Sequence, residues 1–159
     1  MLIGISGVAG VGKDTLGKYI NQKYFYNIYG LSWHMEAMLE PILLRYIPKY
    51  EIDWSNRTWK ETIISGLGIS PRVLKQKLGT EWRNEVSPDK MLWCNLTEID
   101  MKSNGRGINK SVIIDIRFPH EQDWIQYHGG ITIHIMTSRL IDRVVDHVSE
   151  TSIDFSKVA

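Results

Sequence analysis

Short apolar runs alternate with longer amphipathic segments along this chain of 159 residues. The apolar runs have the length and composition of buried β-strands, which are therefore expected at residues 2–6, 27–31, 111–116 and 131–136. In the segments between them apolar residues recur every three or four positions, which predicts helices at about 13–23, 33–46 and 119–127. Strands separated by helices indicate an α/β fold with a mainly parallel sheet.

The stretch from residue 54 to residue 102 has no strand-like run, and its helices are predicted from start signals. A T-x-x-E capping box at 58–61 predicts a short helix through Ile64. Ser-Pro pairs at 70–71 and 87–88 combine an N-cap residue with proline at the first helical position, and each predicts a longer helix. The last of these is expected to continue as an amphipathic helix through Met91, Leu92, Asn95, Leu96 and Ile99.

Composition narrows the class of protein without naming an activity. Hydrophobic residues make up 43% and charged residues 23%, as in a globular protein, and the net charge of +1 provides no basic stripe for nucleic acid. No apolar run has the length of a membrane span, and the first run is too short for a signal peptide. The single cysteine, Cys94, cannot form an internal disulfide, which fits a cytoplasmic protein.

The strongest chemical signal is a glycine-rich loop between the first predicted strand and the first predicted helix. It has the spacing G-x-x-x-x-G-K, in which glycines let backbone N–H groups turn inward and the lysine reaches the terminal phosphates of a nucleotide. The hydroxyl that usually follows the lysine comes one position later, after an aspartate, and these two residues are the candidate Mg²⁺ ligands. The predicted nucleotide-binding residues are Gly7, Val8, Ala9, Gly10, Val11, Gly12, Lys13, Asp14 and Thr15.

Phosphoryl transfer also needs charge neutralisation and an aligned acceptor. Asp115 ends an apolar strand downstream of the loop, where α/β sheets bind ligands, although an aspartate there can also cap the following turn. Arg117 leaves the same strand and could pair with Asp115 or face an acceptor phosphate. Arg72, Arg139 and Arg143 are further candidates, each of which would be an ordinary surface arginine without a ligand. The five histidines have no metal-ligand spacing and are expected in ordinary roles.

Four ordered blocks of this sequence resemble the bacteriophage deoxynucleoside monophosphate kinases, a branch of the P-loop nucleotide kinases. The first block is G-K-D-T at 12–15, and the second is R-V-L-K-Q-K-L-G-T at 72–80, followed by M-L-W at 91–93. The third is D-I-R at 115–117 with H-E at 120–121 and the Gly-Gly pair at 129–130, and the fourth is D-H-V-S-E at 146–150.

The resemblance implies a three-layer α/β/α P-loop fold that transfers the γ-phosphate of ATP to a deoxynucleoside monophosphate (dNMP), with Mg²⁺. It implies one domain over residues 1–159, with a helical acceptor-binding insertion at about 33–102 and a lid-like region at about 137–150. It also implies a catalytic set of Lys13, Asp115, Arg117, Arg139 and Arg143, the last two in the lid. The positions it places on the monophosphate side are Arg72, Gly79, Thr80, Trp93, Asp115, Arg117 and Glu121. Trp93 is a candidate for packing against the base, with a helix-core role as the alternative.

Departures from the family pattern leave alternatives open. Glu36 stands where some relatives have a lysine, Thr137-Ser138-Arg139 replaces an Arg-Pro pair, and the chain ends at Ala159, before a further edge strand and helix. A shortened end would weaken ATP binding, expose a sheet edge or leave it for a partner chain, and a homodimer is compatible with this pattern. The alternatives to a dNMP kinase are a nucleotide-binding protein without kinase activity and a P-loop kinase for another small acceptor.

Overall fold

The computed structural model describes residues 1–104, 107–136 and 153–159. The chain forms two compact units, of which the first comprises Met1–Leu31 with Trp93–Ala159 and the second comprises Ser32–Leu92. The expected lid at 137–150, with Arg139 and Arg143, lies outside the described residues.

The first unit is built on a sheet whose strands, in the part of the chain that is described, are all parallel. The strands lie side by side in the order β2-β3-β1-β4, and their bounds are Leu2–Ser6 (β1), Asn27–Tyr29 (β2), Ser111–Ile116 (β3) and Ile131–His134 (β4). Every residue of β1 is buried, as expected for a central strand covered on both faces. The predicted parallel α/β sheet is therefore confirmed.

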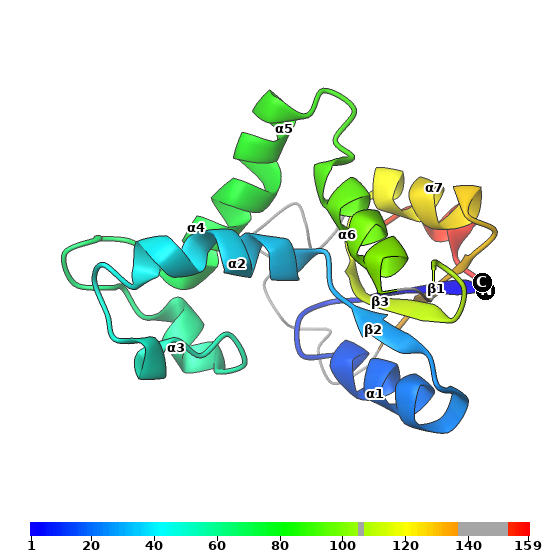
Figure 1. Ribbon diagram of the computed structural model, residues 1–159, viewed down its shortest axis with the longest axis horizontal. Helices are drawn as coiled ribbons and strands as arrows, with labels where there is room; N and C mark the ends of the chain where they lie inside the picture. The colour runs from blue at the N-terminus through cyan, green and yellow to red at the C-terminus, as the bar shows by residue number, and fades with distance from the viewer. Residues whose placement is uncertain (105–106, 137–152) are drawn as a thin grey trace. The chain divides into compact units, whose positions relative to one another are not determined.

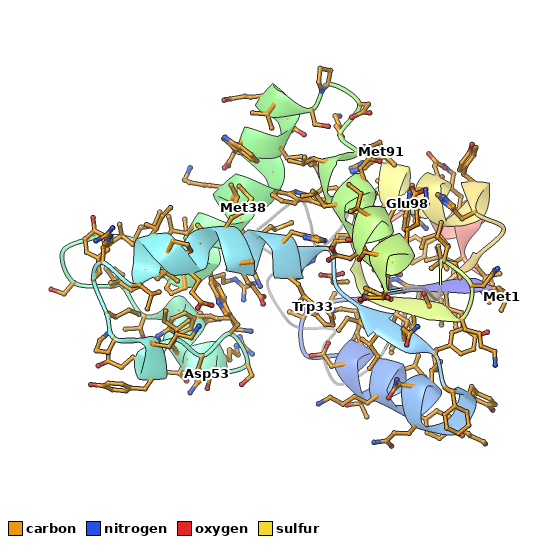
Figure 2. The ribbon with its side chains drawn as sticks, viewed as in Figure 1. Met1, Trp33, Met38, Asp53, Met91 and Glu98 are labelled. Atoms are coloured by element: carbon orange, nitrogen blue, oxygen red, sulfur yellow. The ribbon has the colours of Figure 1, made fainter. Side chains whose placement is uncertain are left out.

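Helices cover both faces of this sheet (Figure 1). The helix α1 (Lys13–Tyr24) packs on one face, and α6 (Leu92–Ser103) and α7 (Pro119–Tyr127) lie on the other. On α6, Glu98 (labelled in Figure 2) accepts a hydrogen bond from Trp124 Nε1 of α7 at 3.4 Å. The first unit thus has the three-layer α/β/α arrangement that the sequence predicts.

The buried core beneath α1 consists of branched aliphatic side chains from β1, β3 and the helix. Its buried members are Ile3, Ile5, Val112 and Ile20. A Cβ at Gly17 of α1 would lie 2.5 Å from Ile114 Cγ2, so the helix rests directly on the sheet at this point. Burial of these apolar side chains is the main driving force for this layer.

The second unit is helical and has a core of its own around Leu39, Leu43 and Ile64. Its elements are α2 (Ser32–Leu43), η1 (Lys49–Glu51), α3 (Arg57–Glu61), α4 (Pro71–Lys77), η2 (Leu78–Trp82) and α5 (Arg83–Val86). The last three follow one another without a break, and η2 is a π-helical segment, which leaves the backbone ladder locally irregular.

Two of the three predicted helix starts in residues 54–102 need correction. The N-cap of α3 is Asn56, whose Oδ1 accepts from Trp59 N at 3.1 Å, so the predicted capping box at Thr58 is wrong. Ser70 is the N-cap of α4, as predicted, and accepts from Val73 N. Ser87 does not start a helix, because its hydroxyl donates to Asp89 Oδ1 in a turn and α6 begins only at Leu92.

The buried face of α6 also differs from the prediction. Trp93, Cys94, Thr97 and Met101 face the core, whereas Ile99 is 61% exposed. The packing of α6 within the first unit, rather than its pattern of large apolar residues, decides which stripe is buried.

The end of the chain pairs with the sheet. After η5 (Phe155–Lys157), Val158 forms a parallel bridge with Thr132 of β4, and Ala159 N donates to Thr132 O at 2.9 Å. The strand β4 ends at His134, two residues earlier than predicted. Part of the β4 edge, which the sequence left exposed, is therefore covered by the chain's own C-terminal residues.

Candidate functional site

The glycine-rich loop follows β1 directly and has a backbone that only glycine adopts easily. Gly7, Gly10 and Gly12 all have positive φ, at +138°, +83° and +104°. A Cβ at Gly7 would lie 2.6 Å from the carbonyl oxygen of Ile135, so this position also lacks room for a side chain. The loop geometry matches the expectation of a narrow turn made by glycines between a strand and a helix.

Lys13, the first residue of α1, folds back over this loop. Its Nζ donates to Gly7 O at 2.6 Å and to Val8 O at 2.9 Å. The N-cap of the helix is Gly12, which has no side chain with which to cap the backbone N–H groups of the first turn. Asp14 and Thr15, in that turn, are both exposed. A lysine ammonium beside a helix start whose N-cap is glycine is an arrangement that can hold an anion.

The base of the loop is anchored to the neighbouring strand β4. Ser6, which is fully buried, has its hydroxyl 2.9 Å from His134 Nδ1, and Ile135 N donates to Ser6 O at 3.0 Å. Burial lowers the pKa of His134, and the positive charge of Lys13 lowers it further. The sequence predicts only an ordinary role for His134. The signal for its position is that parallel strands β1 and β4 end side by side.

Asp115 and Arg117 stand at the carboxyl end of β3, where the sequence predicts a ligand site. Asp115 Oδ1 accepts a hydrogen bond from Leu31 N at 2.8 Å, which ties β3 to the segment after β2. Both side chains are partly exposed. This bond goes to the segment after β2 and not to the turn that follows β3, so the ligand role of Asp115 and the turn-capping alternative both stay predictions.

Glu121, expected on the monophosphate side, is only 4% exposed. Its Oε2 accepts from Arg117 N at 2.6 Å and from Phe118 N at 3.0 Å. Burial raises the pKa of Glu121 to about 7 against the effect of these two amide bonds, and the negative charge of Asp115 adds to the increase.

Trp93 is 2% exposed and lies in the core of the first unit. A base can stack only on an accessible ring face, so this burial favours the helix-core alternative, and a base-packing role for Trp93 stays a prediction.

The remaining acceptor-side residues belong to the second unit. Arg72 Nη1 lies 3.4 Å from Glu61 Oε1, and its side chain is 30% exposed. Gly79 is buried in η2, where a Cβ would lie 2.8 Å from Met35 Sδ, and Thr80 beside it is partly exposed. The structure places these residues within their own unit only, so their roles stay predictions.

Glu36, the departure from the family pattern, has a partner inside the same unit. Its Oε1 lies 2.6 Å from Lys75 Nζ, and that ammonium lies 5.1 Å from the centroid of the Trp54 ring. Both charged side chains are about one-fifth exposed, at 21% for Glu36 and 19% for Lys75. The carboxylate therefore forms a partly buried ion pair within the helical unit.

Among residues 1–104, 107–136 and 153–159, no three His, Cys, Asp or Glu side chains gather as a metal site would require. No helix among them is long and apolar enough to cross a membrane.

The deoxynucleotide monophosphate kinase family model matches residues 51–158, which is more than half of the chain. The chain therefore belongs to the deoxynucleotide monophosphate kinase family, a family of phosphotransferases, and the resemblance read from the sequence is confirmed. The matched span begins after the glycine-rich loop, so the loop is a separate indication of phosphate chemistry. A comparison with curated proteins finds no match.

Proposed function

We propose that this deoxynucleotide monophosphate kinase uses ATP as its phosphoryl donor and binds the ATP phosphates at the loop Gly7–Gly12. The observation that carries this proposal is the position of Lys13, whose ammonium is held by two carbonyl oxygens of the loop. Phosphate oxygens are stronger acceptors than carbonyls, so a bound polyphosphate would draw the ammonium away from them. The uncapped start of α1 adds backbone donors at the same place.

The acceptor is a dNMP, and Arg117 and Asp115 form its side of the site. Ligands bind at the carboxyl ends of parallel strands, and both residues stand at the end of β3. A monophosphate oxygen already carries negative charge at pH 7 and needs no strong general base. The residues therefore act by positioning the acceptor and by balancing its charge. Arg139 and Arg143 would add cations from the lid, and Arg72, Gly79 and Thr80 would contact the acceptor from the helical unit.

Asp14 and Thr15 are the proposed protein ligands of Mg²⁺. Both are exposed oxygen-bearing side chains in the first turn of α1, next to Lys13. This donor set fits Mg²⁺, which prefers oxygen and commonly takes only one or two protein ligands beside waters and phosphates. When bound, the ion would neutralise charge on the transferring phosphoryl group.

A coupled ADP-release assay with ATP, Mg²⁺ and each of the four dNMPs tests the proposal. Wild-type turnover on at least one dNMP is expected, with Lys13→Ala reducing kcat at least about 100-fold through lost transition-state charge stabilisation. Lys18→Ala, an exposed lysine on the same helix, is the matched control and should behave as wild type. ATP binding without turnover would favour a regulatory nucleotide-binding protein, and turnover only with another metabolite would favour a different acceptor.

The Arg117→Ala variant tests the acceptor side separately. We expect it to raise the dNMP KM or lower kcat while ATP affinity changes little, because Arg117 is assigned to the acceptor. An equal loss of ATP affinity would remove that assignment.

We also propose that the partners are small nucleotides, that the protein acts in the cytoplasm, and that it forms a homodimer. Cys94, which is buried and forms no disulfide, is compatible with a reducing compartment. Light scattering of the purified chain at micromolar concentration tests the dimer, and a monomer mass would refute it.

A further inference from the structure

The turn between β3 and α7 is closed by a single buried carboxylate. Arg117 and Phe118 connect the strand to the helix, and Phe118 has no polar side-chain atom with which to cap α7. Glu121, in the first turn of α7, reaches back to the connection instead: its Oε2 accepts from both Arg117 N and Phe118 N. In return, Glu121 N donates to Phe118 O at 3.0 Å. The backbone of Arg117 is thereby locked to the start of the helix.

This way of closing the turn is energetically costly. A serine or aspartate at the N-cap would accept from amides two or three residues further along the chain, so it could not replace the bonds to Arg117 N and Phe118 N. A carboxylate that is 4% exposed loses its hydration, and its raised pKa reflects that loss. Both hydrogen bonds of its Oε2 go to the segment that carries Arg117. The free-energy cost of burying this carboxylate is thus linked to fixing one short piece of backbone at the end of β3.

The same piece of backbone is also held from its other side. Asp115, two residues before Arg117, accepts from Leu31 N at 2.8 Å. The stretch from Asp115 to Arg117 therefore has one anchor toward β2 and a second anchor toward α7. With Asp115 fixed, the two bonds of Glu121 hold the backbone at Arg117 and Phe118, and this backbone sets the direction in which the Arg117 side chain leaves the chain.

We propose that Glu121 is a positioning residue for the kinase reaction, which orients Arg117 toward the dNMP through its bonds to the two turn amides and does not touch the substrate itself. This inference rests on the proposed acceptor role of Arg117. Burial keeps Glu121 from contacting a nucleotide, and a carboxylate facing a monophosphate would repel it. The acceptor-side role that the resemblance implies for Glu121 is thus exerted through Arg117.

Two conservative variants distinguish the effect of the length of the Glu121 side chain from the effect of its negative charge. In Glu121→Gln the amide oxygen keeps the same reach and can accept from both amides, but the negative charge is gone. In Glu121→Asp the charge stays, but the side chain is one methylene shorter and cannot bond both amides from the same backbone position. Asp123→Asn removes a carboxylate with 57% exposed side chain from the same helix and is the matched control.

The test of this proposal is to measure the KM for dNMP and the KM for ATP of each variant by steady-state kinetics, with one substrate varied at a time. Glu121→Asp is expected to raise the dNMP KM about tenfold, since small misplacements of a substrate-positioning group have effects of this order. The ATP KM should stay within about twofold of wild type, and Glu121→Gln and Asp123→Asn should stay within about threefold for both substrates.

The inference is overturned by any of three results. The first is a Glu121→Asp enzyme with wild-type KM values. The second is a Glu121→Gln enzyme as impaired as Glu121→Asp, which would make the charge itself the active feature. The third is an equal rise of both KM values in Glu121→Asp. Absence of wild-type turnover on all dNMPs would refute the proposed function instead, so the two failures are distinguishable.

Discussion

Replacing Glu121 by glutamine should change how the stability of this protein depends on pH. The wild-type carboxyl is buried, and its pKa rises from the usual 4.5 to about 7. Because the folded state binds this proton more tightly than the unfolded state, its contribution to stability is fully present below about pH 4.5. That contribution is lost as the pH rises through about 7. Glutamine has no proton to lose in this range, so the variant lacks this part of the pH dependence.

The shift in the pKa of Glu121 sets the size of the effect. A change from 4.5 to about 7 corresponds to about 3 kcal/mol, at about 1.4 kcal/mol for each pH unit. At low pH the protonated carboxyl and the amide are both neutral and similar in shape, so the two proteins should be about equally stable. Above pH 7 the variant should be the more stable by about 3 kcal/mol, and most of this difference should develop between pH 5 and pH 8.

Urea unfolding of wild type and Glu121→Gln at pH 5, 6, 7 and 8 measures the difference in free energy of unfolding. Comparison at each pH cancels the titration of all other groups. Asp123→Asn, from the exposed surface of the same helix, should differ from wild type by less than about 0.5 kcal/mol throughout. A Glu121→Gln difference that is constant from pH 5 to pH 8 would refute the reasoning. One that falls with pH would mean that the two amide bonds outweigh the cost of burial.

Three further substitutions test the local geometry by urea unfolding. Gly17→Ala should lower the free energy of unfolding, because overpacking against Ile114 costs about 1–3 kcal/mol and exceeds the helix propensity gain of about 1 kcal/mol; a more stable variant would show that α1 does not rest on the sheet. Asn56→Ala should cost about 1 kcal/mol through loss of the N-cap, and an equal cost for Thr58→Ala would restore the capping box to Thr58. Gly7→Ala should cost about 1–3 kcal/mol because of its positive φ and the nearby carbonyl, and unchanged stability would contradict the loop conformation.

Local signals were enough for much of the fold. The apolar runs at β1 and β3 predict buried strands because both faces of a central strand must exclude water. Ser70 predicts the start of α4, because an N-cap acts on amides within three residues of itself. The start of α6 was not predicted correctly, since Ser87 has the same local chemistry but its hydroxyl bonds Asp89 in a turn.

In the candidate site, too, some residues could be placed from local sequence signals and others could not. Lys13 and Asp115 could be placed from the sequence, because a glycine-rich loop and a strand end both lie at the carboxyl edge of a parallel sheet. His134 could not, since its contact with Ser6 depends on which strands become neighbours. For Glu121 the sequence indicates only the acceptor side, and its bonds to the turn amides depend on the path from β3 to α7.

What the sequence determines by itself is therefore the parallel α/β sheet, the glycine loop with its lysine, and the family. Each of these depends on residue type and short spacing, which act through backbone conformation and apolar burial. The tertiary structure alone decides which polar groups are buried and what they bond to. The hydration of Glu121, and with it the cost of its charge, is set by how the folded chain packs around the carboxyl, and the charge of Asp115 at the end of β3 adds to that cost.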